Sequence, residues 1–301
     1  MVTAKLVGGI SNQFCIYAAV KSLCINKNYE MDIDLIHYNK LNQRSFGFDN
    51  FNIEYRAISG AERFNKFSLV NFSYGGRFGL KITNYINQLV LRKNKNIYKE
   101  QDLHFDENFY NIDDETYIDG NFISYKYYSS VLDLLKVEFK PRIISENCST
   151  LAKQIASENS AAFHYRCGDY LSNPIAKNFH GNLGLDYYKQ AFDVLNSKCT
   201  NLVSYIFTDD LVKAKRHFSF IDNAIFIQEK AKLSDLEELE LMKYAKANVI
   251  ANSGFSRWAA LLNYNSDSFT ILPKTWFKGY DIDTQEIGPN SWERLPSNFV
   301  S

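Results

Sequence analysis

The chain has 301 residues, of which 46% are hydrophobic and 23% charged, with only five prolines. This length and composition predict a globular protein of two α/β domains of about 150 residues each. The 34 basic residues are matched by 34 acidic ones, so the net charge is zero. A neutral chain has no overall attraction for polyanions, and we expect no nucleic-acid partner.

The predicted elements begin with a strand over residues 4–8, a helix over about 12–26 and a second strand over 30–35. A Gly8-Gly9 turn separates the first strand from the helix. It is not a dinucleotide fingerprint, because the G-x-G-x-x-G spacing is absent. From residue 36 to about 140 the chain is rich in Asn, Tyr and Phe, and we predict only helices and loops there.

One segment in this region departs from the balanced charge. Residues 63–99 contain no Asp or Glu but eight basic residues: Arg63, Lys66, Arg77, Lys81, Arg92, Lys93, Lys95 and Lys99. A solvated basic face is the simpler interpretation. The alternative is a patch for anionic lipid or a lipid-diphosphate acceptor, to which each basic residue would contribute about 1 kcal/mol.

The second half alternates strands and helices more clearly. We predict strands at 161–166, 203–208, 224–228, 248–251 and 268–272, and helices at 185–195, 211–217, from 234 onward and at 255–264. Ser234 and Glu237 have the spacing of a capping box, which marks a helix start. This alternation predicts βαβ units and a parallel sheet, which binds ligands at the carboxyl ends of its strands.

The cysteines and the apolar segments bear on cellular location. Cys15, Cys24, Cys148, Cys167 and Cys199 lack CxxC or zinc-ligand spacing, as expected of reduced thiols. We identify no signal peptide and no window of the roughly 18 apolar residues that a membrane span needs. We therefore expect a cytoplasmic protein, whose contact with the inner membrane face would be peripheral, through residues 63–99.

Three polar clusters follow strands of the second half. The first is His164 to Tyr170, where the Arg166 guanidinium could grip a diphosphate with two parallel hydrogen bonds. The second is Asn252-Ser253-Gly254-Phe255-Ser256, where small residues open a helix and let backbone N–H groups approach a phosphate. The third is Asp209-Asp210, which offers carboxylates to a base or ribose or, alternatively, caps a helix. Together they predict metal-independent stabilisation of a leaving nucleoside diphosphate.

At this point the chain resembles glycosyltransferase family 11, the bacterial α-1,2-fucosyltransferases. The matching segments run in order through most of the chain: Gly8 to Gln13 with Tyr17-Ala18, Asp119 to Phe122 with Tyr127-Tyr128, His164 to Tyr170, His180-Gly181 with Tyr187-Tyr188, Phe207 to Asp210, Glu240 to Met242, and Asn252 to Trp258. The resemblance implies a GT-B type α/β fold, with two Rossmann-like lobes whose parallel sheets face a central cleft. Residues 1–145 would form the acceptor-side lobe and residues 146–301 the lobe that binds GDP-fucose.

The resemblance also assigns roles to single residues. It implies that Arg166, with His164 beside it, binds the donor diphosphate, that Ser253 to Ser256 form the phosphate loop, and that Asn12 and Gln13 reach toward the donor sugar. The chain departs from the family pattern at Ser11, Cys167, Gly254 and Arg257. Because Cys167 removes a cation, we hypothesise that Arg257, in the first turn of the helix, restores it near the phosphate loop.

The general base is open between two residues. Asp169 is either a helix cap or the acceptor of the hydroxyl proton, and we rank it first. His180 is second, since a structural role is equally compatible with its pattern, and His164 fits a role in loop geometry better than one in proton transfer.

The function implied by the resemblance is inverting transfer of L-fucose from GDP-fucose to the 2-hydroxyl of a galactose-type residue. The acceptor would be an oligosaccharide or lipid-linked glycan of O-antigen type, and neither a metal nor another cofactor is expected. Two alternatives stay open: a degenerate transferase that binds nucleotide or glycan without catalysis, and a transferase for another GDP-sugar or linkage.

Overall fold

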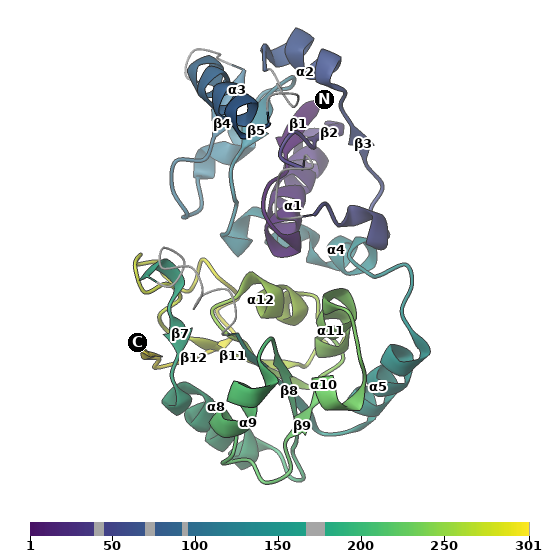
Figure 1. The fold of residues 1–301 in the computed structure, drawn as a ribbon, viewed down its shortest axis with the longest axis vertical. Helices are drawn as coiled ribbons and strands as arrows, with labels where there is room; N and C mark the ends of the chain where they lie inside the picture. Colours follow the sequence, from purple (N-terminus) through teal and green to yellow (C-terminus); the bar gives the residue numbers. More distant parts are fainter. Residues whose placement is uncertain (39–44, 70–75, 92–95, 167–177, 301) are drawn as a thin grey trace. The chain divides into compact units, whose positions relative to one another are not determined.

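The computed structural model describes residues 1–38, 45–69, 76–91, 96–166 and 178–300 (Figure 1). The chain divides into two compact units, Met1–Phe139 and Lys140–Ser301. The division therefore falls a few residues before the boundary predicted between residues 145 and 146. Each unit is built around its own parallel β-sheet with helices packed on it, which is the α/β fold of two lobes with parallel sheets that the sequence predicts.

The N-terminal unit contains a five-stranded sheet in the order β3-β2-β1-β5-β4, with every neighbouring pair parallel. Its strands are β1 (Val2–Lys5), β2 (Met31–Asp34), β3 (Arg56–Ala57), β4 (Ile97–Lys99) and β5 (Tyr117–Asp119). The βαβ unit predicted at the start of the chain is present, because α1 (Ile10–Lys27) joins β1 to the parallel β2. The prediction of only helices and loops between residues 36 and 140 is wrong for β3, β4 and β5.

The rest of this unit is helical and aromatic. The helices are α2 (Gly60–Phe67), α3 (Gly76–Leu91) and α4 (Leu132–Glu138), with short 3-10 turns at Phe48–Asn50, Glu107–Asn111, Tyr125–Tyr127 and Ser129–Val131. Rings rather than aliphatic side chains fill the space beside α1: Phe14 stacks on Phe139 with ring centroids 3.8 Å apart and meets the edge of Phe51 at 5.0 Å.

A buried carboxylate ties β2 to the rest of the N-terminal unit. The side chain of Asp34, at the end of β2, is fully buried and accepts hydrogen bonds from Arg63 (3.0 Å), the Tyr117 hydroxyl (2.7 Å) and the backbone N–H of Ile36 (2.9 Å). Arg63 itself is buried, and Lys66 lies 3.8 Å from Asp32 on the same strand. The interpretation of residues 63–99 as one solvated basic face is therefore wrong for Arg63, whose charge neutralises a buried acid.

The C-terminal unit contains a six-stranded parallel sheet in the order β12-β11-β10-β6-β8-β9. The strands are β6 (Ser160–Tyr165), β8 (Val203–Thr208), β9 (Ile225–Phe226), β10 (Ala247–Val249), β11 (Phe269–Pro273) and β12 (Glu293–Leu295). A separate antiparallel pair joins β7 (Asn182–Leu183) to β13 (Phe299–Val300). The predicted strand at 224–228 is only partly right, because the chain turns into a helix at Ile227.

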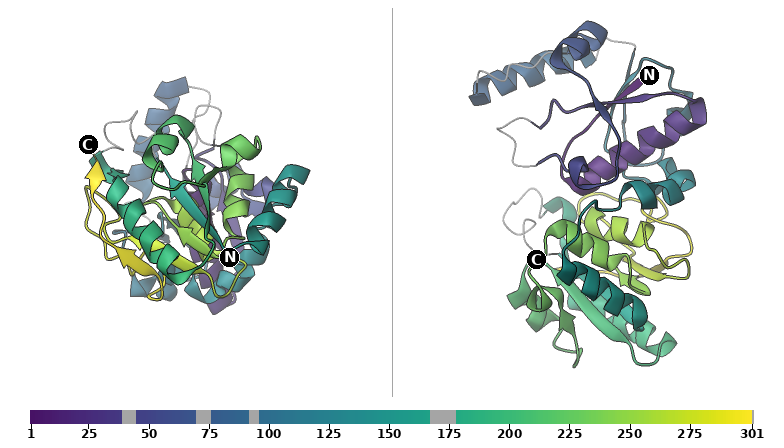
Figure 2. Two further views of the ribbon diagram at one scale, coloured as in Figure 1. Left: turned by 90° about the horizontal axis from the view of Figure 1, so that it is seen from below. Right: turned by 90° about the vertical axis from the view of Figure 1, so that its right-hand side faces the viewer.

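Helices cover both faces of this sheet (Figure 2). They are α5 (Glu146–Ser157), α8 (Leu185–Lys198), α9 (Leu211–His217), α10 (Ile227–Lys230), α11 (Asp235–Met242) and α12 (Gly254–Leu261). One face packs an apolar core against α8 and α9, with Phe163, Ile206 and Val249 of the sheet against Tyr188 and Phe218. The predicted capping box is confirmed, since the Ser234 side chain accepts from Glu237 N and the Glu237 carboxylate accepts from Ser234 N.

A buried ion pair lies where α11 ends. The Lys243 ammonium lies 2.6 Å from Glu240, and both side chains are essentially inaccessible to solvent. The Tyr264 hydroxyl donates to the other carboxylate oxygen of Glu240 at 2.8 Å. Glu240 belongs to the segment Glu240 to Met242 that matches the family pattern, and all three of its side chains are buried.

Candidate functional site

The three polar clusters predicted from the sequence lie at the ends of neighbouring strands. In the sheet, β6 lies between β10 and β8, and all three run parallel. Arg166 follows β6, Asp209 follows β8, and the segment from Asn252 to Ser256 follows β10. Because parallel strands end on the same edge, the sheet brings these clusters together at its carboxyl edge, where α/β proteins bind ligands.

Arg166 and Asp209 form an ion pair across this edge. One guanidinium nitrogen of Arg166 lies 3.0 Å from Asp209 Oδ2, and the side chains are 29% and 25% exposed. The pair is thus neither buried nor fully solvated. Asp209 orients the guanidinium of Arg166, whose planar fork carries five N–H donors in all.

His164 links β6 to the first turn of α12. Its Nδ1 is 2.9 Å from the Ser256 hydroxyl, and its backbone carbonyl accepts from the Tyr188 hydroxyl at 2.9 Å. Burial, together with the nearby Arg166 cation, lowers the pKa of His164 to about 3. The imidazole is therefore neutral near pH 7, which agrees with a role in holding geometry rather than shuttling protons.

Asn252 holds the turn that carries His180. Its side-chain amide donates to the carbonyls of His180 (2.9 Å) and Gly181 (3.2 Å). Gly181 has φ +68°, and a Cβ at this position would lie 2.6 Å from the Phe299 ring. The His180 ring lies beside Phe277, with centroids 5.5 Å apart. The contact with Asn252 thus places His180 near the end of β10. The proposed role of His180 in proton transfer stays a prediction.

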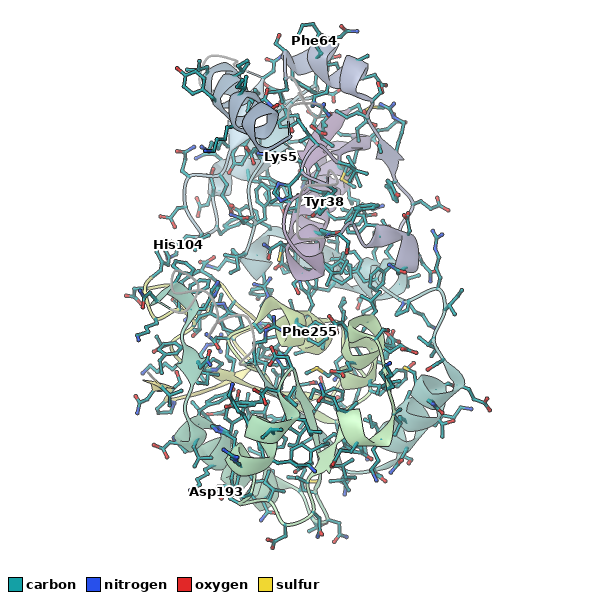
Figure 3. The ribbon with its side chains drawn as sticks, viewed as in Figure 1. Lys5, Tyr38, Phe64, His104, Asp193 and Phe255 are labelled. Atoms are coloured by element: carbon teal, nitrogen blue, oxygen red, sulfur yellow. The ribbon has the colours of Figure 1, made fainter. Side chains whose placement is uncertain are left out.

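The start of α12 is the segment predicted to form the phosphate loop. Ser253 is the N-cap of α12, and its hydroxyl accepts from the backbone N–H of Phe255 at 3.3 Å (Figure 3 labels Phe255). One N–H of the first helical turn is therefore satisfied by a side chain of the same segment. Gly254 follows as the first helical residue. Arg257 is fully buried, with its guanidinium carbon 5.8 Å from the centroid of the Trp258 ring. Its suggested contact with the donor phosphates stays a prediction.

The two adjacent aspartates at the end of β8 have different partners. Asp210 is the N-cap of α9: its carboxylate accepts from Lys213 N at 3.0 Å and pairs with the Lys213 ammonium at 2.8 Å. These Lys213 contacts lower the pKa of Asp210. The helix-cap interpretation is therefore correct for Asp210, whereas Asp209 is the member of the pair that faces Arg166.

The predicted N-terminal loop lies in the other unit. Gln13 is fully buried, and its side chain holds this loop in place. Its Nε2 donates to the carbonyls of Gly8 (3.2 Å) and Ser45 (2.9 Å), and its Oε1 accepts from Gly47 N at 3.0 Å. Gly8 has φ +75°, and a Cβ there would lie 2.6 Å from the Asn12 amide nitrogen. Asn12 is exposed, so of the two residues it is the one with surface available to a ligand. Asp169 and Cys167 lie outside the described residues.

Glu238 on α11 is a titratable group near this edge that the sequence did not suggest. Burial, helped by the carboxylates of Asp235 and Asp209, raises the pKa of Glu238 to about 7. A high pKa of this kind depends on which side chains meet in three dimensions, and the sequence contained no signal for it.

Replacing Glu238 by glutamine is expected to stabilise the protein at pH 8 by about 2–3 kcal/mol. The folded protein holds the Glu238 proton up to a pKa of about 7, whereas the ordinary value is 4.5. The wild type therefore loses stability as pH rises through about 7, while glutamine stays neutral. Urea unfolding at pH 8 and pH 4 checks this: the gain should vanish at pH 4, and equal gains at both pH values would contradict the assignment.

Two further observations concern other kinds of site. Among the described residues, no cluster of three or more His, Cys, Asp or Glu side chains has the arrangement of a metal site. Within the same part of the chain, none of the helices combines the length and apolarity required to cross a bilayer.

Relatives among characterised proteins match nearly the whole chain. An O-antigen biosynthesis glycosyltransferase from Escherichia coli, WbnK, is 27% identical and covers 96% of this chain and 99% of its own length. An α-1,2-colitosyltransferase from Escherichia coli is 28% identical, covering 98% of this chain and 99% of its own.

Solved structures match more distantly. Fucosyltransferase NodZ from Bradyrhizobium is 12% identical, with a TM-score of 0.44 over 87% of this chain and 92% of that one. POFUT1 in complex with GDP-fucose is 10% identical, with a TM-score of 0.48 over 90% and 97%. The model of glycosyl transferase family 11 matches residues 82–293, which include the exits of β6, β8 and β10. The chain belongs to glycosyl transferase family 11.

Proposed function

We propose that the protein is an inverting transferase that moves L-fucose from GDP-fucose to the 2-hydroxyl of a galactose-type residue in an O-antigen-like glycan. Membership of family 11 and the two Escherichia coli relatives support glycosyl transfer to a surface glycan. The single observation that carries the proposal is the Arg166–Asp209 pair at an edge shared with the start of α12.

The chemistry follows from the charge that the donor releases. When the bond between the sugar C1 and the diphosphate breaks, negative charge grows on the leaving oxygen. Arg166 would meet this charge with parallel hydrogen bonds while Asp209 keeps its guanidinium oriented. The first turn of α12 adds the positive end of a helix dipole. In this scheme no metal is required, and Asp169, then His180, remain our candidates for accepting the acceptor's hydroxyl proton.

One comparison suggests colitose as an alternative donor sugar. One of the relatives is an α-1,2-colitosyltransferase, and colitose differs from fucose only by lacking the 3-hydroxyl. A site for fucose that hydrogen-bonds this hydroxyl would reject colitose strongly, whereas an apolar surface at C3 would favour colitose. The choice between these two GDP-sugars therefore depends on the chemistry that meets C3.

A donor panel tests the proposal directly. The purified full chain is incubated with a β-galactoside acceptor and GDP-fucose, GDP-colitose or GDP-mannose, with and without EDTA, and the products are analysed by mass spectrometry and NMR. We expect α-1,2-linked fucose, unchanged by EDTA. Preferential transfer of colitose would show that GDP-colitose, and not GDP-fucose, is the donor. Loss of activity with EDTA would contradict the metal-independent scheme. Binding of GDP-sugars without transfer to any acceptor would favour the non-catalytic alternative suggested by Ser11, Cys167, Gly254 and Arg257.

A further inference from the structure

Helix α3 presents apolar side chains to solvent. Ile82, Tyr85 and Leu89 are 37%, 65% and 41% exposed, whereas Thr83 and Gly79 of the same helix are buried. Two residues on the side of α3 that faces the unit are thus small or polar, while three large apolar residues face outward. In Figure 2 (right) α3 extends away from the sheet of its own unit.

The exposed residues form one continuous stripe. An α-helix turns by about 100° per residue, so Lys81, Tyr85, Leu89 and Ile82 fall within an arc of about 100°. Gly79 and Thr83 fall on the opposite side of the helix. We call the four residues Lys81, Ile82, Tyr85 and Leu89 the α3 outer face. Contiguous exposed apolar surface of this kind marks a binding surface rather than ordinary exposure of single residues.

The charge around the α3 outer face indicates that its partner is negatively charged. The sequence has no acidic residue between Glu62 and Glu100, and Lys81 is exposed at the edge of the stripe. Arg63 and Lys66 do not contribute to this surface, because they pair with Asp34 and Asp32 on β2. An apolar stripe with an aromatic residue and a lysine at its edge, in a stretch of sequence without acidic residues, suits a helix that lies in the interface of an anionic membrane.

We propose that the α3 outer face binds the surface of an anionic phospholipid bilayer. Ile82 and Leu89 enter the boundary between headgroups and acyl chains, and Tyr85 sits with its ring at headgroup level. Lys81 extends its ammonium toward the lipid phosphates. The proposal is independent of the donor sugar, because it rests on the N-terminal unit alone. A second copy of the chain would be a poorer occupant, since two such faces would bring their lysines together.

Flotation with lipid vesicles tests this proposal. The full chain is mixed with vesicles of phosphatidylcholine alone or of phosphatidylcholine with phosphatidylglycerol, which supplies the anionic headgroups. The variant I82E/Y85E/L89E is compared with I25E/V137E/V212E, which adds the same three charges at other exposed apolar positions. Circular dichroism and thermal unfolding confirm that both variants are folded.

We expect the wild type and I25E/V137E/V212E to float with the anionic vesicles and to be released by high salt. I82E/Y85E/L89E should bind about a hundredfold more weakly, because three apolar side chains lose their burial in the interface. Absence of wild-type binding, equal loss in both triple variants, or a wild-type dimer that dissociates only in I82E/Y85E/L89E would overturn the proposal. If I82E/Y85E/L89E is unfolded, Tyr85→Ser alone replaces it, with an expected loss of about tenfold.

Discussion

Substitution of Arg166 by alanine is expected to leave the protein folded and to lower sugar transfer by about a hundredfold to ten-thousandfold. Two charge-assisted hydrogen bonds to a diphosphate contribute about 3–6 kcal/mol, and each 1.36 kcal/mol is a factor of ten in rate. The fold should tolerate the change because Asp209, which loses its partner, is 25% exposed and can be hydrated. Transfer rate, GDP affinity and the thermal midpoint are the three measurements.

Two other variants separate a role in binding from a role in structure. Arg216→Ala removes an exposed guanidinium on α9 of the same unit and should leave the rate unchanged. Asp209→Ala breaks the same ion pair but keeps the Arg166 cation. If the only role of Arg166 were to form the ion pair with Asp209, Arg166→Ala and Asp209→Ala would weaken GDP binding equally. We expect Arg166→Ala to lose more GDP affinity, because it also removes the contact with the diphosphate. Turnover of Arg166→Ala close to that of the wild type would refute the proposed mechanism.

The largest loss of stability is expected from Lys243→Met. Removing the ammonium leaves the Glu240 carboxylate buried without its counter-charge, which costs about 3–5 kcal/mol. The hydrogen bond from the Tyr264 hydroxyl does not offset a full charge. Urea unfolding at pH 7 measures the difference in the free energy of unfolding.

A double variant distinguishes charge burial from poor packing. In Glu240→Gln/Lys243→Met the glutamine still accepts from Tyr264, and no charge remains buried. This protein should regain most of the lost stability, since exchanging a buried ion pair for neutral groups is often nearly neutral. A double variant as unstable as Lys243→Met would show that methionine does not fit the space of the lysine, and that the charge is not the cause.

Much of the second half of the fold could be predicted because several of its elements are long and regular, although the short strands β7, β12 and β13 were not. Strands such as Val203–Thr208 and helices such as Leu185–Lys198 carry enough residues for their periodicity to be visible. By contrast β3, β4 and β5 have two or three residues each, too few for any alternation. The N-terminal unit also relies on clustered rings around α1, such as Phe14 and Phe139, which have no regular spacing in the sequence.

The candidate site was predictable in its location and less so in its contacts. The rule that parallel strands end on one edge brought Arg166, Asp209 and the start of α12 together. It did not show which of Asp209 and Asp210 caps α9, or that Gln13 holds its loop with three hydrogen bonds. These partners are far apart in sequence or depend on the direction of a side chain, and both are decided by tertiary packing.

The contacts of Asn252 and His164 affect how substitutions in this protein will be interpreted. Each joins segments more than 70 residues apart in the chain, Asn252 to the Gly181 turn and His164 to Ser256. Variants at these positions will lower the amount of folded enzyme as well as its turnover, and a screen that scores only product in cells will group them with true active-site losses. Substitutions at these positions should therefore be ranked by the amount of product formed per folded molecule.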